Sequence, residues 1–299
     1  MWIVLALVSA FFLGLYDIFK KKSLEGNNVL TVLFLNTLFC ALLFIPFIVI
    51  SHTSGSLLQG TPYFVPHGGA TDHLKVLIKS VIVLASWTMG YYAIKNLPIT
   101  IAGPVNATRP VLVLIGAVAL FGERLNLYQW TGIALALTSS FLPVILNRKE
   151  GIAFSRNKWI WCSVGATVMG AVSGLYDKQL MREMEPMFVQ SWYVVYQCLL
   201  MGLLLFRIYR KGIEKQTPFR WVWSIPFISL FLSVADFAYF YALSFDESMI
   251  SIVSMLRRCS VVVSFIYGAV ALQEKNIKAK VLDMILVLAG LVFLVLGSR

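Results

Sequence analysis

Apolar residues in this chain gather in long runs, and short polar gaps separate the runs. A helix needs about 20 mostly apolar residues to cross a bilayer, and ten runs are long enough. The pattern therefore predicts ten membrane-spanning helices, at residues 2–21, 28–51, 75–95, 99–121, 126–147, 158–181, 187–209, 221–243, 248–272 and 279–297.

The long gap at residues 52–74 holds all three histidines of the chain, His52, His67 and His73. Three histidines suggest a metal site, but spacings of this kind match no compact zinc motif. We therefore expect a solvated loop here and no bound metal.

The composition agrees with a membrane protein. The chain is 59% hydrophobic and 13% charged, with a mean hydropathy of +0.80. A soluble domain is about 45–50% apolar and about 25% charged. The net charge of +11 does not indicate nucleic-acid binding, because the basic residues occupy the gaps between the runs, where they act as topology signals. We expect an all-α integral membrane protein that binds no nucleic acid.

A duplication divides the chain into two halves. The sequence GLYD at residues 14–17 returns at residues 174–177, and the sequence GAVAL at 116–120 returns at 268–272. We predict two five-helix repeats, residues 1–148 and 158–299, joined by a linker at residues 149–157. Five spans in each half force the second half to be inverted, as in many secondary transporters.

The basic residues predict how the chain is oriented in the membrane. The odd-numbered loops between the predicted helices contain sixteen Lys and Arg residues, and the opposite side contains six. Cytoplasmic loops are enriched in Lys and Arg. This bias places the odd loops in the cytoplasm and both termini outside, in a multi-pass protein of a cell membrane such as the bacterial inner membrane.

Two junctions resemble a known family. Residues 119–125 read ALFGERL before a Gly- and Ala-rich helix, residues 271–275 read ALQEK, and residues 255–260 read MLRRCS. This pattern resembles the EamA-type ten-helix branch of the drug/metabolite transporter superfamily. The resemblance implies a carrier of small metabolites without specifying which. Many relatives have cytoplasmic termini, the reverse of the orientation that the basic residues predict here.

Each copy of the repeated sequence ends in an aspartate inside an apolar run, Asp17 and Asp177. A charged residue within a membrane span is costly and usually marks a transport path or proton site. The alternative is a structural ion pair, because Lys20 and Lys21 lie near Asp17 and Lys178 follows Asp177. The two surroundings differ, so one aspartate could bind a proton while the other is structural.

Four other charged residues lie deep in predicted spans. Arg109 and Arg258 occupy equivalent positions in the two halves, and Arg257 precedes Arg258. An arginine cannot readily lose its charge, so each needs a substrate anion or a structural acid. Asp236 faces the same two alternatives, as a site for a proton or a substrate amine, or as the partner of a buried arginine.

Aromatic and amide side chains accompany these charges and suit an amphipathic binding cavity. We expect helices 1, 3, 4, 6, 8 and 9 to supply it. The candidate lining residues are Tyr16, Tyr176, Trp87, Tyr91, Asn106, Tyr193, Gln197 and Tyr239.

Two further features concern helix shape. Prolines at 98, 104 and 110 predict a bent fourth helix, and the absence of proline from residues 248–272 predicts a straight ninth helix.

Glu123 and Glu274 stand at the two equivalent junctions, and we expect them to cap the helices that follow or to pair with Arg124 and Lys275.

These observations favour a secondary transporter that moves a small polar or amphipathic metabolite by alternating access, with protons as a candidate coupling ion. No nucleotide-binding loop or catalytic pattern is present, so neither ATP drive, an enzymatic activity nor a cofactor is expected. An intramembrane enzyme, a channel, a lipid or small-molecule flippase and a receptor with the same cavity are the alternatives. The sequence does not specify the oligomeric state.

Overall fold

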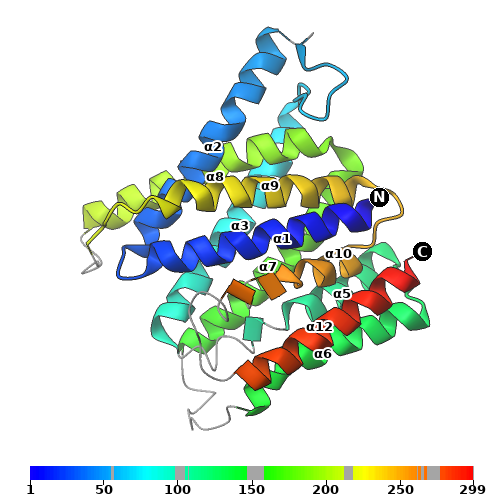
Figure 1. The fold of residues 1–299 in the computed structure, drawn as a ribbon. Helices are drawn as coiled ribbons and strands as arrows, with labels where there is room; N and C mark the ends of the chain where they lie inside the picture. The colour runs from blue at the N-terminus through cyan, green and yellow to red at the C-terminus, as the bar shows by residue number, and fades with distance from the viewer. Residues whose placement is uncertain are drawn as a thin grey trace.

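The structure is a computed structural model, and it describes residues 1–54, 57–97, 105–106, 108–146, 158–211, 218–260, 262–263, 266–267 and 277–298. For residues 91, 94–95, 139–146 and 277–283 it describes the main chain only. Ten helices lie in these ranges (Figure 1): α1 (Trp2–Leu24), α2 (Val29–Thr53), α3 (Ala70–Asn96), α5 (Arg109–Phe121), α6 (Leu127–Leu146), α7 (Lys158–Glu183), α8 (Pro186–Lys211), α9 (Ser224–Ser244), α10 (Ile250–Arg257) and α12 (Ile277–Gly297).

The all-helical membrane fold is confirmed. In the described ranges, six helices are long and apolar enough to cross a bilayer, namely α1, α2, α3, α7, α8 and α9, and two shorter apolar helices cover Arg109–Phe121 and Met284–Gly297. Most observed helix ends lie within a few residues of the predicted ones. A hydrophobic run has this predictive power because backbone groups inside a bilayer must bond within their own helix.

The start of α3 differs from the prediction. The helix begins at Ala70, and the Asp72 carboxylate accepts a hydrogen bond from the Gly69 backbone N–H at 2.9 Å. This cap extends the helix one polar turn beyond the apolar run. His73 therefore lies in a helix and not in a solvated loop. His52 and His67 stack with ring centroids 4.1 Å apart.

The predicted ninth helix, residues 248–272, is interrupted by a tighter turn in its described part, and residues 260, 262–263 and 266–267 are helical again. Helix α10 ends at Arg257, where the backbone N–H groups of Arg258 and Cys259 bond to carbonyls three residues earlier. Such a tighter turn often marks a hinge or strain. Residues 250–260 contain neither proline nor glycine, so this turn has no local sequence signal. The residues around Pro98 and Pro104 lie outside the described ranges.

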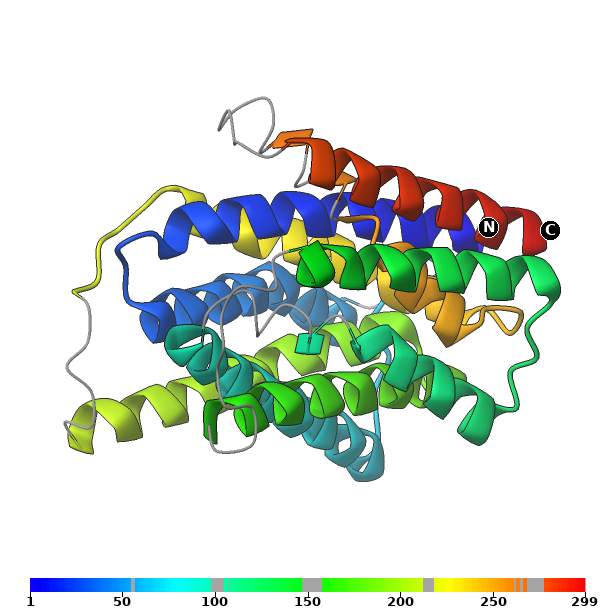
Figure 2. The same ribbon diagram turned by 90° about the horizontal axis from the view of Figure 1, so that it is seen from below.

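The helices pack in pairs that recur between the two halves of the chain (Figures 1 and 2). Helix α1 packs along α9, and the corresponding α7 packs along α3. Helix α5 contacts α7 as α10 contacts α1, whereas α2 pairs with α8 and α6 with α12. Both termini lie at one end of the bundle. We call this end the terminal side, and the opposite end, where α1 and α8 finish, the basic side.

Close backbone approach and aromatic contacts hold these pairs together. A Cβ atom on Gly132 of α6 would lie 2.7 Å from the Gly290 carbonyl oxygen of α12, so neither position has room for a side chain. Between α1 and α9, Phe19 contacts Phe231 with ring centroids 5.2 Å apart. Small residues and tight packing are the usual means of helix association in lipid, which offers no hydrophobic driving force between helices.

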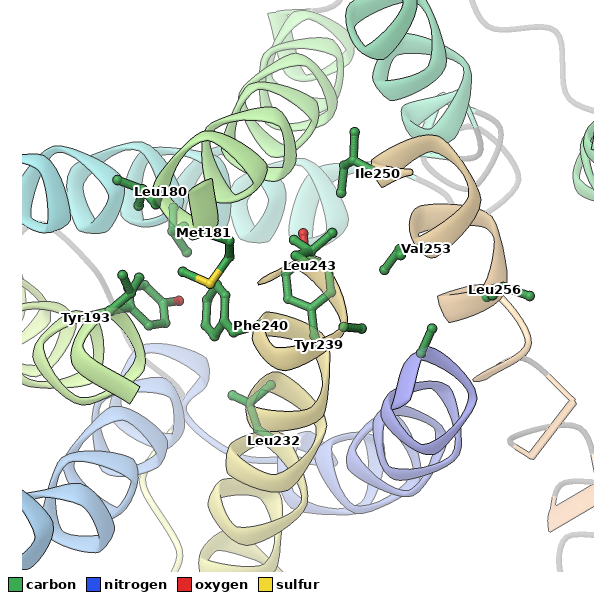
Figure 3. Packing of buried hydrophobic residues seen from close by; sticks show 14 of the residues in the cluster. Leu180, Met181, Tyr193, Leu232, Tyr239, Phe240, Leu243, Ile250, Val253 and Leu256 are labelled. Carbon is green, nitrogen blue, oxygen red and sulfur yellow. The ribbon is translucent and has the colours of Figure 1, made fainter. Parts of the chain in front are cut away.

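Helix α9 is the central element, because it contacts α1, α2, α7, α8 and α10. Figure 3 shows the buried side chains that converge there, with Tyr239 and Phe240 of α9 beside Met181 of α7 and Tyr193 of α8. Tyr239, Phe240 and Met181 are each at most 5% exposed. Polar groups on these helices are therefore held away from lipid.

Candidate functional site

A buried ion pair joins the two halves between α3 and α7. Lys79 bonds to the Asp177 carboxylate, and the two side chains are 3% and 7% exposed. The Lys79 ammonium also lies over the rings of Tyr193, at 4.4 Å, and Phe240, at 4.9 Å. Asp177 is thus a neutralised, structurally paired residue, as one of the two sequence hypotheses proposed.

Lys79 itself was not among the predicted site residues. It lies in the tenth position of α3 and was counted with the basic residues of the even-numbered side. A lysine several residues inside an apolar run was the signal that could have identified it, because a lysine at that depth needs a partner.

A second ion pair lies between α9 and α10. Arg257 donates to Asp236 at 2.9 Å, and its guanidinium carbon lies 4.1 Å from the centroid of the Tyr239 ring. The Tyr239 hydroxyl donates in turn to Asp177 at 3.3 Å. Tyr239 therefore bridges the two ion pairs. The predicted partnership of Asp236 with a buried arginine is present, and Arg257 supplies it.

A small cavity adjoins Asp236. Its volume is about 10 Å³, which is roughly the space that one water molecule needs. Helices α2, α3, α8 and α9 enclose it, with lining residues Asn36, Thr37, Cys40, Trp87, Gln190, Tyr193, Val194, Gln197, Leu232, Ser233 and Asp236. Four predicted residues are therefore brought together, namely Trp87, Tyr193, Gln197 and Asp236.

The cavity wall carries polar atoms without hydrogen-bond partners. In the part of the chain that the structure describes, these are Gln190 Oε1, both amide atoms of Gln197, and Ser233 Oγ. The three residues are 1%, 2% and 6% exposed. A buried polar group without a partner costs about 1–3 kcal/mol. Such groups on one cavity wall are therefore available to a polar guest.

The lining of this cavity differs from the predicted choice of helices, because α2 and α8 line it and α1, α5, α7 and α10 do not. The prediction followed charged residues inside apolar runs. Helices α2 and α8 contribute neutral polar side chains instead, such as Asn36, Thr37 and Gln190. In a sequence, such residues do not stand out from those that bond to their own backbone.

Asp17 and Arg109 occupy a different environment from the two ion pairs. Neighbouring protein desolvates both side chains, and yet each residue remains exposed. Arg257 lies within electrostatic reach of both, and Lys20 within reach of Asp17. Neither Asp17 nor Arg109 has an ion pair within the described residues.

The remaining predicted residues lie apart from the cavity lining. Tyr16 is buried beneath Lys20, whose ammonium lies 5.1 Å from the ring centroid, and the Tyr176 hydroxyl donates to the Lys75 carbonyl at 3.2 Å. Asn106 lies within hydrogen-bond distance of the Thr167 hydroxyl, at 3.1 Å. Arg258 follows the end of α10. The side chain of Tyr91 lies outside the described residues.

Lys178 does not pair with Asp177, although the two are adjacent in the sequence. Its ammonium donates to the Leu243 and Phe245 carbonyls, at 3.0 and 3.1 Å, and to the Ser248 hydroxyl, at 2.8 Å. These contacts satisfy carbonyl groups at the end of α9. Lys178 therefore caps a helix. It points away from the partners of Asp177 because consecutive helical residues point in directions about 100° apart.

Glu123 also caps a helix, but not the one that follows it. Its carboxylate accepts hydrogen bonds from the backbone N–H of Ile250, at 2.6 Å, and of Ser251, at 3.3 Å, and from the Ser251 hydroxyl. It thus caps α10 in the other half, and the expected pairing with Arg124 or with α6 is wrong. Glu274 lies outside the described residues.

Comparison with known proteins identifies the family. The model of the EamA-like transporter family matches residues 1–145 and again residues 157–296. One solved crystal structure, described only as that of a protein, is similar over 99% of this chain and 97% of its own, with a TM-score of 0.72 and 14% sequence identity. That likeness concerns the fold alone. No match was found among curated proteins. The family match covers nearly the whole chain, and this multi-pass membrane protein therefore belongs to the EamA-like transporter family.

Proposed function

We propose that the protein is a secondary active transporter that carries a small polar metabolite by alternating access. The observation that carries this proposal is the small cavity between α2, α3, α8 and α9, which must widen to admit a metabolite. Its wall presents unpaired amide and hydroxyl groups on Gln190, Gln197 and Ser233. Ligand sites typically combine apolar walls with a few convergent polar groups. Trp87 and Tyr193 supply the aromatic walls.

Two inverted repeats would provide the moving parts. The paired contacts of α1 with α9 and α3 with α7, together with the two family matches, support repeats at residues 1–148 and 158–299 with a linker at 149–157. In transporters of this plan, one repeat moves against the other around a central site. The break at the end of α10 adds a point where a helix can bend, and interrupted helices commonly mark such sites.

The two repeated aspartates would take different roles. Asp177 pairs with Lys79 and Tyr239, so it would hold α3, α7 and α9 together. Asp17 is exposed and has no ion pair within the described residues. A carboxylate of that kind can gain and lose a proton without breaking a buried bond. We therefore assign the proposed proton coupling to Asp17.

Transport is tested with purified protein in two steps. Thermal unfolding is first measured against a metabolite library at two pH values, because a ligand of the folded state raises its apparent stability. Each ligand is then measured in proteoliposomes. We expect saturable uptake that the same solute inside the vesicle accelerates. Asp17→Asn should remove the pH dependence of uptake and leave solute exchange intact.

The cavity is tested by Gln197→Leu, which should weaken ligand binding about tenfold, since it removes two hydrogen-bonding atoms. Leu199→Ala is the matched control, because Leu199 lies on the same helix and is 60% exposed. Flux that neither saturates nor responds to internal solute would indicate a channel. Ligand binding without flux would indicate a receptor. Either result would refute the carrier, as would conversion of the solute, which would indicate an enzyme.

A further inference from the structure

We infer that the transported molecule is a small organic anion, and that its carboxylate or phosphate group binds Arg109 of α5 against Gly170 of α7. The inference rests on the proposed transport function and adds the chemical class of the substrate. It concerns a position outside the cavity described above, at the exposed side of Arg109.

Gly170 leaves the Arg109 guanidinium in direct contact with the α7 backbone. A Cβ atom at position 170 would lie 2.5 Å from Arg109 Cζ, 2.6 Å from Nε and 2.7 Å from one terminal nitrogen. Real Cβ atoms do not approach other atoms this closely. Glycine is therefore required for the guanidinium to lie where it does. One side of the guanidinium rests on α7 while the residue as a whole stays exposed.

The acids near Arg109 already interact with other cations. Asp236 bonds to Arg257, and Asp177 bonds to Lys79. Asp17 interacts electrostatically first with Lys20 and then with Arg257. The one charged group that acts on Arg109 in the described residues is Arg257, which repels it. Two of the interior cations, Lys79 and Arg257, are thus paired with acids, whereas Arg109 has no acid paired with it in the described part of the chain.

An anion beside Arg109 would lower the energetic cost of its charge. Arg109 begins the 13-residue helix α5, so at about 1.5 Å per residue it lies roughly 18 Å from the terminal-side end of that helix. The hydrocarbon core is about 30 Å thick, which puts the guanidinium near mid-membrane. It cannot deprotonate, and an unpaired charge at that depth costs at least a few kcal/mol. Carboxylate and phosphate groups match the planar guanidinium fork through two parallel hydrogen bonds.

Arg257 connects the proposed anion position with the cavity beside Asp236. Arg257 bonds to Asp236, which lines that cavity, and it acts electrostatically on Arg109. The same arginine therefore interacts both with the arginine at the anion position and with one residue of the cavity lining. A molecule with an anionic end and a neutral polar end fits this order of groups.

The test uses purified full-length protein and three small probes: succinate, inorganic phosphate and the uncharged succinamide, which matches succinate in size. Thermal unfolding is followed at constant ionic strength with NaCl, so that general screening is equal in all samples. We expect succinate, phosphate or both to raise the melting temperature in a dose-dependent way, with succinamide ineffective. A response to succinate alone would identify a carboxylate site, and a response to phosphate alone a phosphate site.

Four variants locate the effect. Arg109→Gln and Gly170→Ala should each weaken the anion response at least tenfold, the first by removing the charge and the second by displacing the guanidinium. Gly174→Ala is the matched control on the same helix, because a Cβ there has its nearest neighbour at an ordinary 3.9 Å. Lys75→Gln controls for overall charge, since Lys75 pairs with Glu183 at 2.5 Å on the terminal side. Both controls should bind as the wild type does.

Anions that stabilise the protein no more than NaCl does, or that bind Arg109→Gln as tightly as the wild type, would overturn the inference. These outcomes differ from failure of the transport proposal. If an uncharged or cationic metabolite binds and shows accelerated exchange in both wild type and Arg109→Gln, transport stands and the anion assignment falls. If anions bind at Arg109 but no solute is exchanged, the anion site stands and transport falls.

Discussion

At the scale of single residues, Tyr239 connects two ion pairs that would otherwise be separate. Its hydroxyl donates to Asp177, and its ring lies under Arg257. The buried Lys79–Asp177 pair and the half-buried Arg257–Asp236 pair thereby form one network across α3, α7, α9 and α10. In a medium of low dielectric constant, members of such a network support each other, and removing one leaves the others unsatisfied.

Replacing Lys79 should expose that dependence. Lys79→Met leaves the Asp177 carboxylate buried without its cation, and breaking one partner of a buried pair costs about 3–5 kcal/mol. The double variant Lys79→Met, Asp177→Asn removes both charges and should recover most of that loss. The free energy of unfolding, measured by denaturant titration in micelles, distinguishes the two. A double variant as unstable as the sum of its single variants would show that the pair is not a coupled unit.

At this scale the sequence identified the acidic residues inside apolar runs but not the residues with which they pair. Asp177 and Asp236 were found because acids are rare in apolar runs. Their partners, Lys79 and Arg257, lie 98 and 21 residues away in the chain. Adjacent residues suggested the wrong partner for Asp177, since Lys178 points instead to the end of α9. Partner choice depends on helix packing, which no local pattern encodes.

At the scale of elements, helix existence followed from hydrophobic runs, whereas helix interruption did not. Proline and glycine are the usual signals of a break, and residues 250–260 contain neither. Helix α10 nevertheless ends at Arg257, beside the bond to Asp236. Tertiary contacts therefore outweigh local helix propensity here, and the broken helix could not be predicted from composition.

The cap that Glu123 places on α10 gives a testable consequence of this interrupted helix. A helix only eight residues long depends strongly on its ends, because about half of its backbone N–H groups lack partners within the helix. Glu123→Ala removes three hydrogen bonds from the start of α10 and should cost about 1–2 kcal/mol. Thermal unfolding in micelles measures the loss.

Glu247→Ala is the control for that experiment. Glu247 is an exposed acid in the same α9–α10 connection and makes no hydrogen bond in the described residues. Its removal should leave the melting temperature within about a degree of wild type, since isolated surface charges contribute little. Equal losses in the two variants would mean that charge near α10, and not the specific cap, stabilises the helix.

At the scale of the whole molecule, the duplicated sequence indicated which helices pair. It did not indicate which side of the molecule is open in this conformation. A repeat implies that each contact between the halves recurs with the two halves exchanged. The contact of α1 with α9 and the contact of α7 with α3 show this correspondence. The side chains on matching positions differ, however. Trp87 stands where the other half has Asp236, so the charge network is asymmetric and one side of the molecule is held more tightly.

That asymmetry predicts which side is open. Contacts between the halves close the terminal side, namely Lys75 with Glu183, Lys79 with Asp177 and Glu123 with Ser251. Asp17 lies seven residues before the end of α1, about 10 Å from the basic side, and it is exposed. Water and solutes should therefore reach Asp17 from the basic side, while Ser80, which is fully buried in α3, stays inaccessible from both sides.

Cysteine labelling measures this directly. The four native cysteines, Cys40, Cys162, Cys198 and Cys259, are first replaced, and single cysteines are introduced as Asp17→Cys or Ser80→Cys. A membrane-impermeant thiol reagent is then added to right-side-out or inverted vesicles. We expect Asp17→Cys to react only in inverted vesicles, because the basic residues predict that the basic side is cytoplasmic, and Ser80→Cys to react in neither. Reaction of Asp17→Cys only in right-side-out vesicles would show that the basic side faces outward, opposite to the predicted orientation. Reaction of Ser80→Cys in right-side-out vesicles would contradict a terminal side that stays closed in the protein without substrate.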